Sequence, residues 1–125
     1  MNLSLAEAEQ LLNDLLSSSF QISENQHVIL AVPAIYIPLA VQKVVGKSGI
    51  SIAAQNCYPK ASGAYTGEIS ANMLSSVGVQ HIVIGHSERR EYFHESNDFL
   101  AEKVNATLAI GSTPIFCCGE PLEIR

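Results

Sequence analysis

The chain has 125 residues, of which 47% are hydrophobic and 15% are charged, and its formal net charge is -5. This length and composition suit a single folded domain, while the acidic balance excludes a nucleic-acid partner because no cluster of Lys and Arg could follow a phosphate backbone. No apolar run approaches the ~20 residues that a membrane-spanning helix needs, and the N-terminus lacks a signal-peptide pattern, so we expect a soluble cytoplasmic protein without membrane contacts.

Helical and strand patterns alternate along the whole chain. Apolar residues at helical spacing predict helices, whereas short β-branched runs bounded by Pro or Gly predict buried strands. In chain order the predicted elements are a helix over residues 4–18 with a Ser4–Glu7 capping box, a strand over 27–32 closed by Pro33, a helix over 37–45 with Gly46 as its C-cap, a strand over 50–54, a short helix capped by Ser70 and ended by Gly78, a strand over 80–85, a helix capped by Ser96 that carries Phe99, Leu100, Val104 and Leu108 and is ended by Gly111, and a strand over 114–118.

This alternation predicts one domain over residues 1–125 with four parallel strands covered by helices. Right-handed crossovers should join the strands. Periodicity alone does not separate part of an eight-stranded barrel from an open doubly wound sheet. No strand is followed by a Gly-x-Gly-x-x-Gly segment, so a dinucleotide-binding fold gains no support.

A histidine stands where the third predicted strand ends. Reactive groups of parallel α/β folds gather at the carboxyl ends of strands, and Gly85 allows a tight exit towards His86. We predict that Ser87 caps a new helical turn. The positive end of that helix would keep His86 neutral, so that it could donate a hydrogen bond to a carbonyl oxygen. A histidine satisfied by a local hydrogen bond is the alternative.

Three further features each allow two interpretations. The long loop over residues 55–69 either reaches a substrate or partner or is an ordinary surface loop. The charged residues 88–95 form either helical surface pairs or a buried network that orients His86. The three cysteines are odd in number and fit no zinc spacing, so we interpret them as reduced, packed thiols rather than metal ligands or a disulfide: Cys57, Cys117 and Cys118.

Several segments together resemble triosephosphate isomerase, in the order and at the spacing of that family. The most specific is Gly-His-Ser-Glu-Arg-Arg after a strand, and Gly-Ala-x-Thr-Gly-Glu-Ile-Ser is nearly as specific. The matching segments are residues 1–2, 54–58, 63–70, 84–90, 117–120, the loop over 119–125, and 93–96 with His94 in place of a family glycine. The resemblance covers the whole chain and implies a partial (β/α)8 barrel.

The resemblance implies a role for each matching residue near the third strand. His86 would be the catalytic electrophile that polarises the substrate carbonyl. Ser87 and Glu88 would support it, and Cys117 would pack beside the site. The implied reaction interconverts dihydroxyacetone phosphate and D-glyceraldehyde 3-phosphate without a cofactor or metal.

The resemblance also implies a homodimer. Thr66, Gly67 and Glu68 would lie on the loop that enters the neighbouring subunit. Arg89 and Glu95 would belong to a buried charge network at the same interface.

Three functional parts of the family have no counterpart in these residues: the lysine after the first strand, the base glutamate and the phosphate-binding loops. We therefore expect this chain to be inactive by itself and interpret it as part of a longer enzyme. Two alternatives stay open. One is a non-catalytic half-barrel that acts only through assembly, and the other is one half of a split enzyme.

Overall fold

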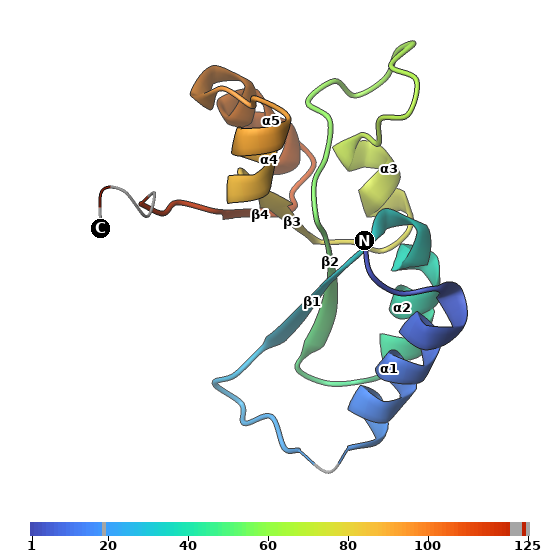
Figure 1. Ribbon diagram of the computed structural model, residues 1–125. Coiled ribbons are helices and arrows are strands. Elements are labelled where there is room, and N and C mark those ends of the chain that lie inside the picture. The colour runs from blue at the N-terminus through green and yellow to red at the C-terminus, as the bar shows by residue number, and fades with distance from the viewer. Residues whose placement is uncertain (19, 121–123, 125) are drawn as a thin grey trace.

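The computed structural model describes residues 1–18, 20–120 and 124 and shows one four-stranded parallel sheet. The strand order β1-β2-β3-β4 follows the chain order, so each strand pairs with the next one in sequence (Figure 1). The predicted strands are confirmed with ends shifted by one or two residues, a normal uncertainty for element boundaries. They span Val28–Val32 (β1), Ile50–Ala54 (β2), His81–Ile84 (β3) and Thr113–Phe116 (β4).

Helices occupy the connections between the strands, as predicted. Ser4, Ser70 and Ser96 each accept a hydrogen bond from the backbone N–H three residues later, which fixes the starts of three helices. None of the described helices is long and apolar enough to cross a membrane. The helices are α1 (Leu5–Ser17), α2 (Ile37–Val44) after a 3-10 turn (Ala34–Tyr36), α3 (Ala71–Ser76), α4 (Ser87–Tyr92) and α5 (Asn97–Ala109).

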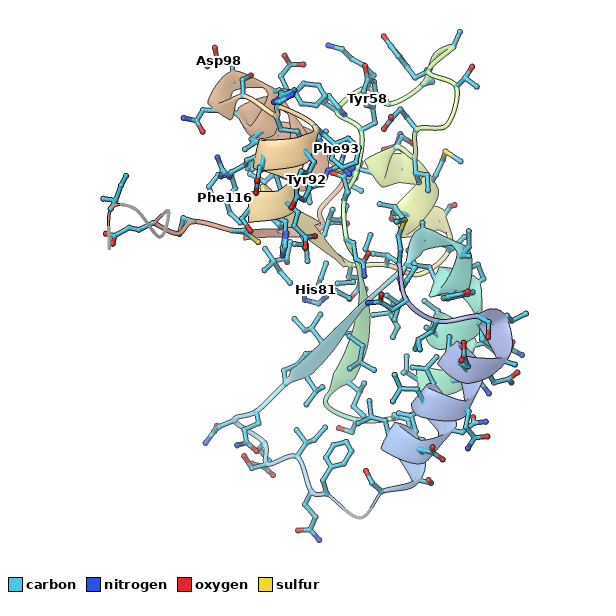
Figure 2. The ribbon with its side chains drawn as sticks, in the orientation of Figure 1. Tyr58, His81, Tyr92, Phe93, Asp98 and Phe116 are labelled. Carbon is cyan, nitrogen blue, oxygen red and sulfur yellow. The ribbon has the colours of Figure 1, made fainter. Side chains whose placement is uncertain are left out.

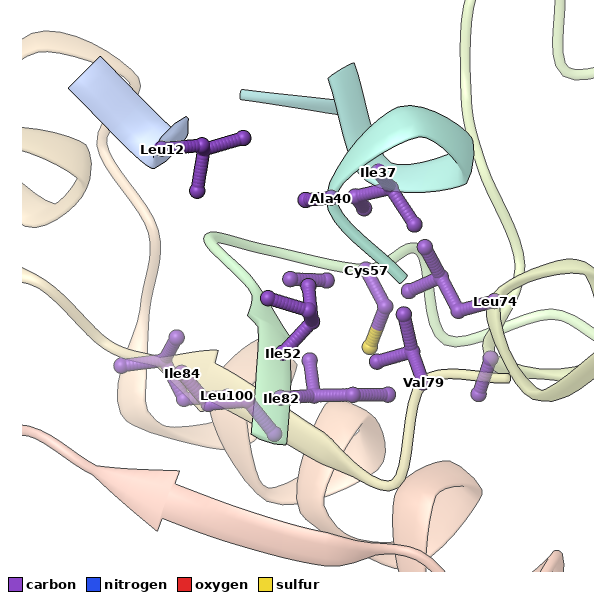
Figure 3. Close-up of a cluster of buried hydrophobic side chains, with 12 residues drawn as sticks. Leu12, Ile37, Ala40, Ile52, Cys57, Leu74, Val79, Ile82, Ile84 and Leu100 are labelled. Carbon is purple, nitrogen blue, oxygen red and sulfur yellow. The ribbon is translucent and has the colours of Figure 1, made fainter. Parts of the chain in front are cut away.

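One face of the sheet is covered by helices and carries the hydrophobic core. Alternate residues of β2 and β3, including Ile52, Ile82 and Ile84, are at most 2% exposed there. They pack against Leu74 of α3 and Leu100 of α5 (Figure 3). Each such side chain contributes roughly 1.5–3 kcal/mol to folding by leaving water. This core fixes the positions at which the strands end.

The opposite face of the sheet is only partly buried. Its alternate positions include Ser51, His81, Val83 and Ile115. Within the described residues β1 and β4 are edge strands, each paired on one side only. Residues 121–123 and 125, which belong to the predicted loop over 119–125, lie outside the described residues. Parallel strands paired in chain order and joined by helices match the arrangement of consecutive strands in a (β/α)8 barrel.

Candidate functional site

Gly85 carries the chain out of β3 with a backbone that favours glycine. Its φ is +78°, in the left-handed region. A β-carbon at this position would stand 2.8 Å from a terminal nitrogen of Arg90 and 3.3 Å from a methyl group of Leu100. Any larger residue would therefore be strained and would collide with its neighbours. Gly85 thus places His86 at the carboxyl end of β3.

His86 is itself the N-cap of α4. Its Nδ1 accepts the backbone N–H of Glu88 at 3.3 Å. The prediction that Ser87 caps this helix is wrong, because the helix begins one residue earlier and an imidazole nitrogen supplies the acceptor. With Nδ1 accepting, the proton of the neutral ring is assigned to Nε2. The Nε2–H group is then left as a hydrogen-bond donor, and the side chain of His86 is 49% exposed.

Arg90 fixes the strand ends around His86. Its Nε–H donates to the carbonyl oxygen of Gly85 at 2.7 Å, and a terminal nitrogen donates to the carbonyl oxygen of Cys117 at 3.0 Å. The other terminal nitrogen donates to the side chain of Asn97 at 3.0 Å. One guanidinium group thereby joins the ends of β3 and β4 to the start of α5. Donors on three nitrogens of a rigid planar fork suit arginine, whereas the three N–H groups of a lysine diverge from a single nitrogen.

Glu88 lies beside His86 but is open to solvent. One carboxylate oxygen is 3.7 Å from His86 Nδ1, and the Glu88 side chain is 71% exposed. Ser87, the first residue of α4, is also exposed. The residues predicted to support His86 are therefore adjacent to it and exposed.

A charge cluster around the buried carboxylate of Glu95 contains Arg89 and Lys103. Arg89 Nε donates to a Glu95 oxygen at 2.9 Å, and Lys103 Nζ donates to the same oxygen. Lys103 also donates to Asn56 at 2.8 Å. The Glu95 side chain is 3% exposed and that of Lys103 is 1% exposed. Two cations around one carboxylate make burial of these charges tolerable.

Sequence reasoning missed Lys103, although a signal existed. Leu100, Lys103 and Thr107 share one helical face and are all fully buried on α5. A lysine in an apolar stripe indicates a buried partner, because the ammonium group cannot be left unpaired there. The stripe predicted from the sequence instead included Leu108, which is 56% exposed.

The loop over residues 55–69 projects from the body of the molecule (Figure 1). The rings of Tyr58 and Tyr65 lie 4.6 Å apart, and the Tyr58 N–H donates to the carbonyl oxygen of Ile69 at 2.8 Å. Gly63 has a φ of +143°, and a β-carbon there would lie 2.5 Å from the Tyr65 ring. This packing orders the loop and leaves its tip, Thr66 to Glu68, exposed.

The cysteines occupy different environments. Cys57 is buried, and burial raises the pKa of its thiol above the ordinary 9.0, although a contact with Thr107 acts in the opposite direction. Cys117 is half-buried at the end of β4, and Cys118 is exposed. All three are free thiols. The described residues contain no group of three or more His, Cys, Asp or Glu side chains that could hold a metal ion.

The structure separates the predicted residues into two regions. His86, Ser87, Glu88 and Cys117 gather at the carboxyl ends of β3 and β4. The loop tip carrying Thr66 projects elsewhere, and no hydrogen bond within the described residues joins it to Glu95. The loop tip with Thr66 and the charge cluster with Glu95 were predicted to lie at one interface. Within the described residues no hydrogen bond joins them.

Comparisons with known proteins agree on one family. A sequence model of that family, described as triosephosphate isomerase, matches residues 1–125. The triosephosphate isomerase of Cytophaga hutchinsonii is 48% identical over 126 residues, covering 100% of this chain and 49% of that protein. That of Fusobacterium nucleatum is 50% identical over 102 residues, covering 82% and 40%, and that of Phocaeicola vulgatus is 43% identical over 125 residues, covering 100% and 49%. The chain thus spans about half the length of the curated relatives it matches.

Proposed function

Because the chain belongs to the triosephosphate isomerase family, we propose that it supplies the electrophilic half of an active site for that isomerisation. The reaction would interconvert dihydroxyacetone phosphate and D-glyceraldehyde 3-phosphate, a cytoplasmic step of glycolysis and gluconeogenesis. His86 would be the catalytic residue of this half, and neither a cofactor nor a metal would take part.

The hydrogen bond between His86 Nδ1 and the Glu88 backbone N–H is the observation that carries the proposal. It assigns the ring proton to Nε2, so a neutral imidazole can donate to a carbonyl oxygen on which negative charge develops during enolisation. The family is itself a well-known instance of a neutral histidine used in this way. The half-exposed side chain of His86 at the carboxyl end of β3 supports the same role.

A complete reaction also needs a general base, and the matching residues include no counterpart of the family's base glutamate. Loss of a general base costs roughly 10²–10⁴ in rate. Glu88 is the nearest described carboxylate to His86, but it contacts the capping nitrogen rather than the free one. We therefore propose that residues 1–125 are inactive alone and act within a complete barrel.

The proposed partner is a second copy of the chain. Oε2 of Glu95 is buried and makes no hydrogen bond with any described residue. A buried acceptor without a donor is costly, so it favours a donor from outside the chain. The hydroxyl of Thr66 from another copy would suit this place, because Thr66 stands exposed on an ordered, projecting loop.

A chimeric enzyme tests the proposed function. Residues 1–125 would replace the matching 126-residue segment of the Cytophaga hutchinsonii relative, and isomerisation of glyceraldehyde 3-phosphate would be measured. We expect turnover that falls by about 10²-fold or more in His86→Gln, since one preorganised donor is lost. The matched control is His94→Asn, which changes a histidine outside the site and should leave turnover unchanged.

Two results would count against this function. Equal turnover in the chimera and its His86→Gln variant would remove His86 from the mechanism. A chimera that is folded by circular dichroism yet turns over no substrate would favour the non-catalytic assembly instead.

A further inference from the structure

The position of the His86 ring depends on the backbone that carries it. The His86 side chain is 49% exposed, and its Nδ1 accepts the backbone N–H of Glu88. A half-exposed ring keeps a constant direction only if the groups that support it are themselves held in place. The supports here are the two peptide groups on either side of His86, which carry the carbonyl oxygens of Gly85 and of His86 itself.

Arg90 donates a hydrogen bond to both of these carbonyl oxygens. Its backbone N–H donates to the carbonyl oxygen of His86 at 3.1 Å, at the start of α4. Its side-chain Nε–H donates to the carbonyl oxygen of Gly85 at 2.7 Å. The guanidinium group fits there because residue 85 has no side chain, since a β-carbon would stand 2.8 Å from a terminal nitrogen of Arg90. One residue therefore holds the peptide groups before and after His86.

The Arg90 side chain also continues the pairing of β3 with β4 beyond the end of the sheet. Ile84 is paired with Phe116, and the backbone N–H of Cys117 donates to the carbonyl oxygen of Ile84 at 2.8 Å. A terminal nitrogen of Arg90 then donates to the carbonyl oxygen of Cys117 at 3.0 Å, while Nε holds Gly85. The guanidinium group thus replaces a further backbone link between the strands at the point where the chain has turned into α4.

The three side-chain acceptors of Arg90 are neutral oxygens, so its contacts depend on geometry more than on charge pairing. The third acceptor is the side chain of Asn97 at the start of α5, at 3.0 Å. The guanidinium carbon lies 5.4 Å from the ring centroid of Phe116, which is labelled at the end of β4 in Figure 2. All these partners belong to β3, β4 or the segments that connect them, so the arrangement is internal to one strand–helix–strand unit.

We propose that Arg90 is a positioning residue for the isomerisation and acts through the two peptide groups that flank His86. The inference rests on the proposed function, in which His86 is the electrophile. A donor that stabilises developing negative charge must already stand where the substrate oxygen will be, and a displacement of about 1 Å costs roughly a hundredfold in rate. Substrate affinity depends less on Arg90, because the phosphate-binding loops of the family have no counterpart in these residues. Loss of Arg90 should therefore lower kcat and leave KM nearly unchanged.

Steady-state kinetics of the chimera with the Cytophaga hutchinsonii relative test the proposal. Arg90→Met should lower kcat about tenfold to a hundredfold and change KM by less than about threefold. Arg90→Lys keeps the charge but replaces the planar fork with a single nitrogen, so it should restore kcat only in part. The matched control is Lys43→Gln, which removes a cation bonded to Glu9 and Asn13 on α1. This control should leave kcat unchanged even if it lowers stability.

Nitrogen-15 NMR of the chimera labelled at histidine measures the state of the His86 ring directly. The His86 signals are assigned by their absence from the spectrum of His86→Gln. The unaltered chimera should show a protonated Nε2 and an unprotonated Nδ1. Arg90→Met should show a mixture of the two tautomers, because the ring is no longer held against the N–H of Glu88. A general loss of stability would not change the tautomer of a folded protein.

The outcomes separate this inference from the proposed function. If His86→Gln lowers kcat and Arg90→Met does not, the role of Arg90 is overturned and that of His86 is kept. If His86→Gln has no effect, both are overturned. A loss confined to KM, or an equal loss of kcat in Lys43→Gln, would also overturn the positioning role. Arg90→Lys replaces Arg90→Met in each comparison if circular dichroism shows that the methionine variant is unfolded.

Discussion

Two pairs of side chains lie after β3 in the sequence and have opposite environments. His86 and Glu88 are 49% and 71% exposed, whereas Glu95 and its partner Lys103 are 3% and 1% exposed. The exposed pair is held through backbone geometry, by Gly85 and by the capping N–H. The buried pair is held by the ion pairs of Glu95 with Arg89 and Lys103 and by the hydrogen bond from Lys103 to Asn56. The first arrangement leaves the His86 side chain half exposed to solvent, and the second removes its charged groups from solvent.

The largest effect is expected from breaking the buried pair. Lys103→Met leaves Arg89 as the one cation paired with the buried Glu95 among the described residues, and removal of one partner of a buried ion pair typically costs about 3–5 kcal/mol. The free energy of unfolding in urea measures this cost. Lys103→Met combined with Glu95→Gln should recover part of it, because no unpaired carboxylate then stays buried.

The exposed ion pair between Lys60 and Glu102 provides the matched control. Its side chains are 53% and 51% exposed, so solvent screens the attraction. Lys60→Met should leave the urea midpoint unchanged. Equal midpoints for Lys60→Met and Lys103→Met would mean that burial does not distinguish the two kinds of pair.

A smaller effect on stability is expected from ionisation of the buried thiol of Cys57, and the exposed thiol of Cys118 provides the comparison. The unfolded chain releases the Cys57 proton near pH 9.0, while burial raises the pKa in the folded state. The folded state therefore holds this proton to higher pH, so the stability contributed is present below pH 9 and declines as the pH rises further. The decline is at most about 1.4 kcal/mol per pH unit.

Urea unfolding between pH 8 and pH 10.5 measures that slope. Cys57→Ala should reduce it, since the titrating thiol is gone. Cys118→Ala, at an exposed position, should keep the parent slope. A Cys57→Ala slope identical to that of the parent would show that other groups account for the alkaline loss of stability.

The smallest effect on stability is expected at His94, which lies between α4 and Glu95 in the sequence. His94 has a φ of +52°, which side chains with a β-carbon adopt at a cost of about 1–2 kcal/mol. His94→Gly relieves this strain but adds about 0.4–1 kcal/mol of unfolded-state entropy. A net gain of about 0.5 kcal/mol should appear as a higher urea midpoint. His94→Val should lower the midpoint, and a gain for both variants would contradict the argument.

Local features were predictable from the sequence, and tertiary pairings were not. The caps at Ser4, Ser70 and Ser96 depend on residues three positions away, so they can be identified in the linear sequence. The cap at His86 was assigned to Ser87 because hydroxyl caps are far commoner than imidazole caps. The hydrogen bond between Lys103 and Asn56 joins residues that are 47 positions apart, and no periodic pattern in the sequence predicts it.

The resemblance to a family supplied what periodicity could not. It predicted that Arg89 and Glu95 belong to one charge network, and the structure places those two side chains in contact. The role it implies for His86 stays a prediction. It did not indicate that His27 and His81 both contact Ser51, because these contacts depend on the register of neighbouring strands. Residues this far apart in the sequence become neighbours only when the strands pair.

The contact between the tilted rings of Tyr58 and Tyr65 has a consequence for the docking of another molecule on this loop. A loop that is disordered before contact must lose conformational entropy when it docks, which weakens binding. The loop over residues 55–69 is instead ordered by its own aromatic pair and by Gly63. Thr66 therefore has a fixed position before a partner binds. Docking would then depend on the relative orientation of the two molecules and not on folding of the loop.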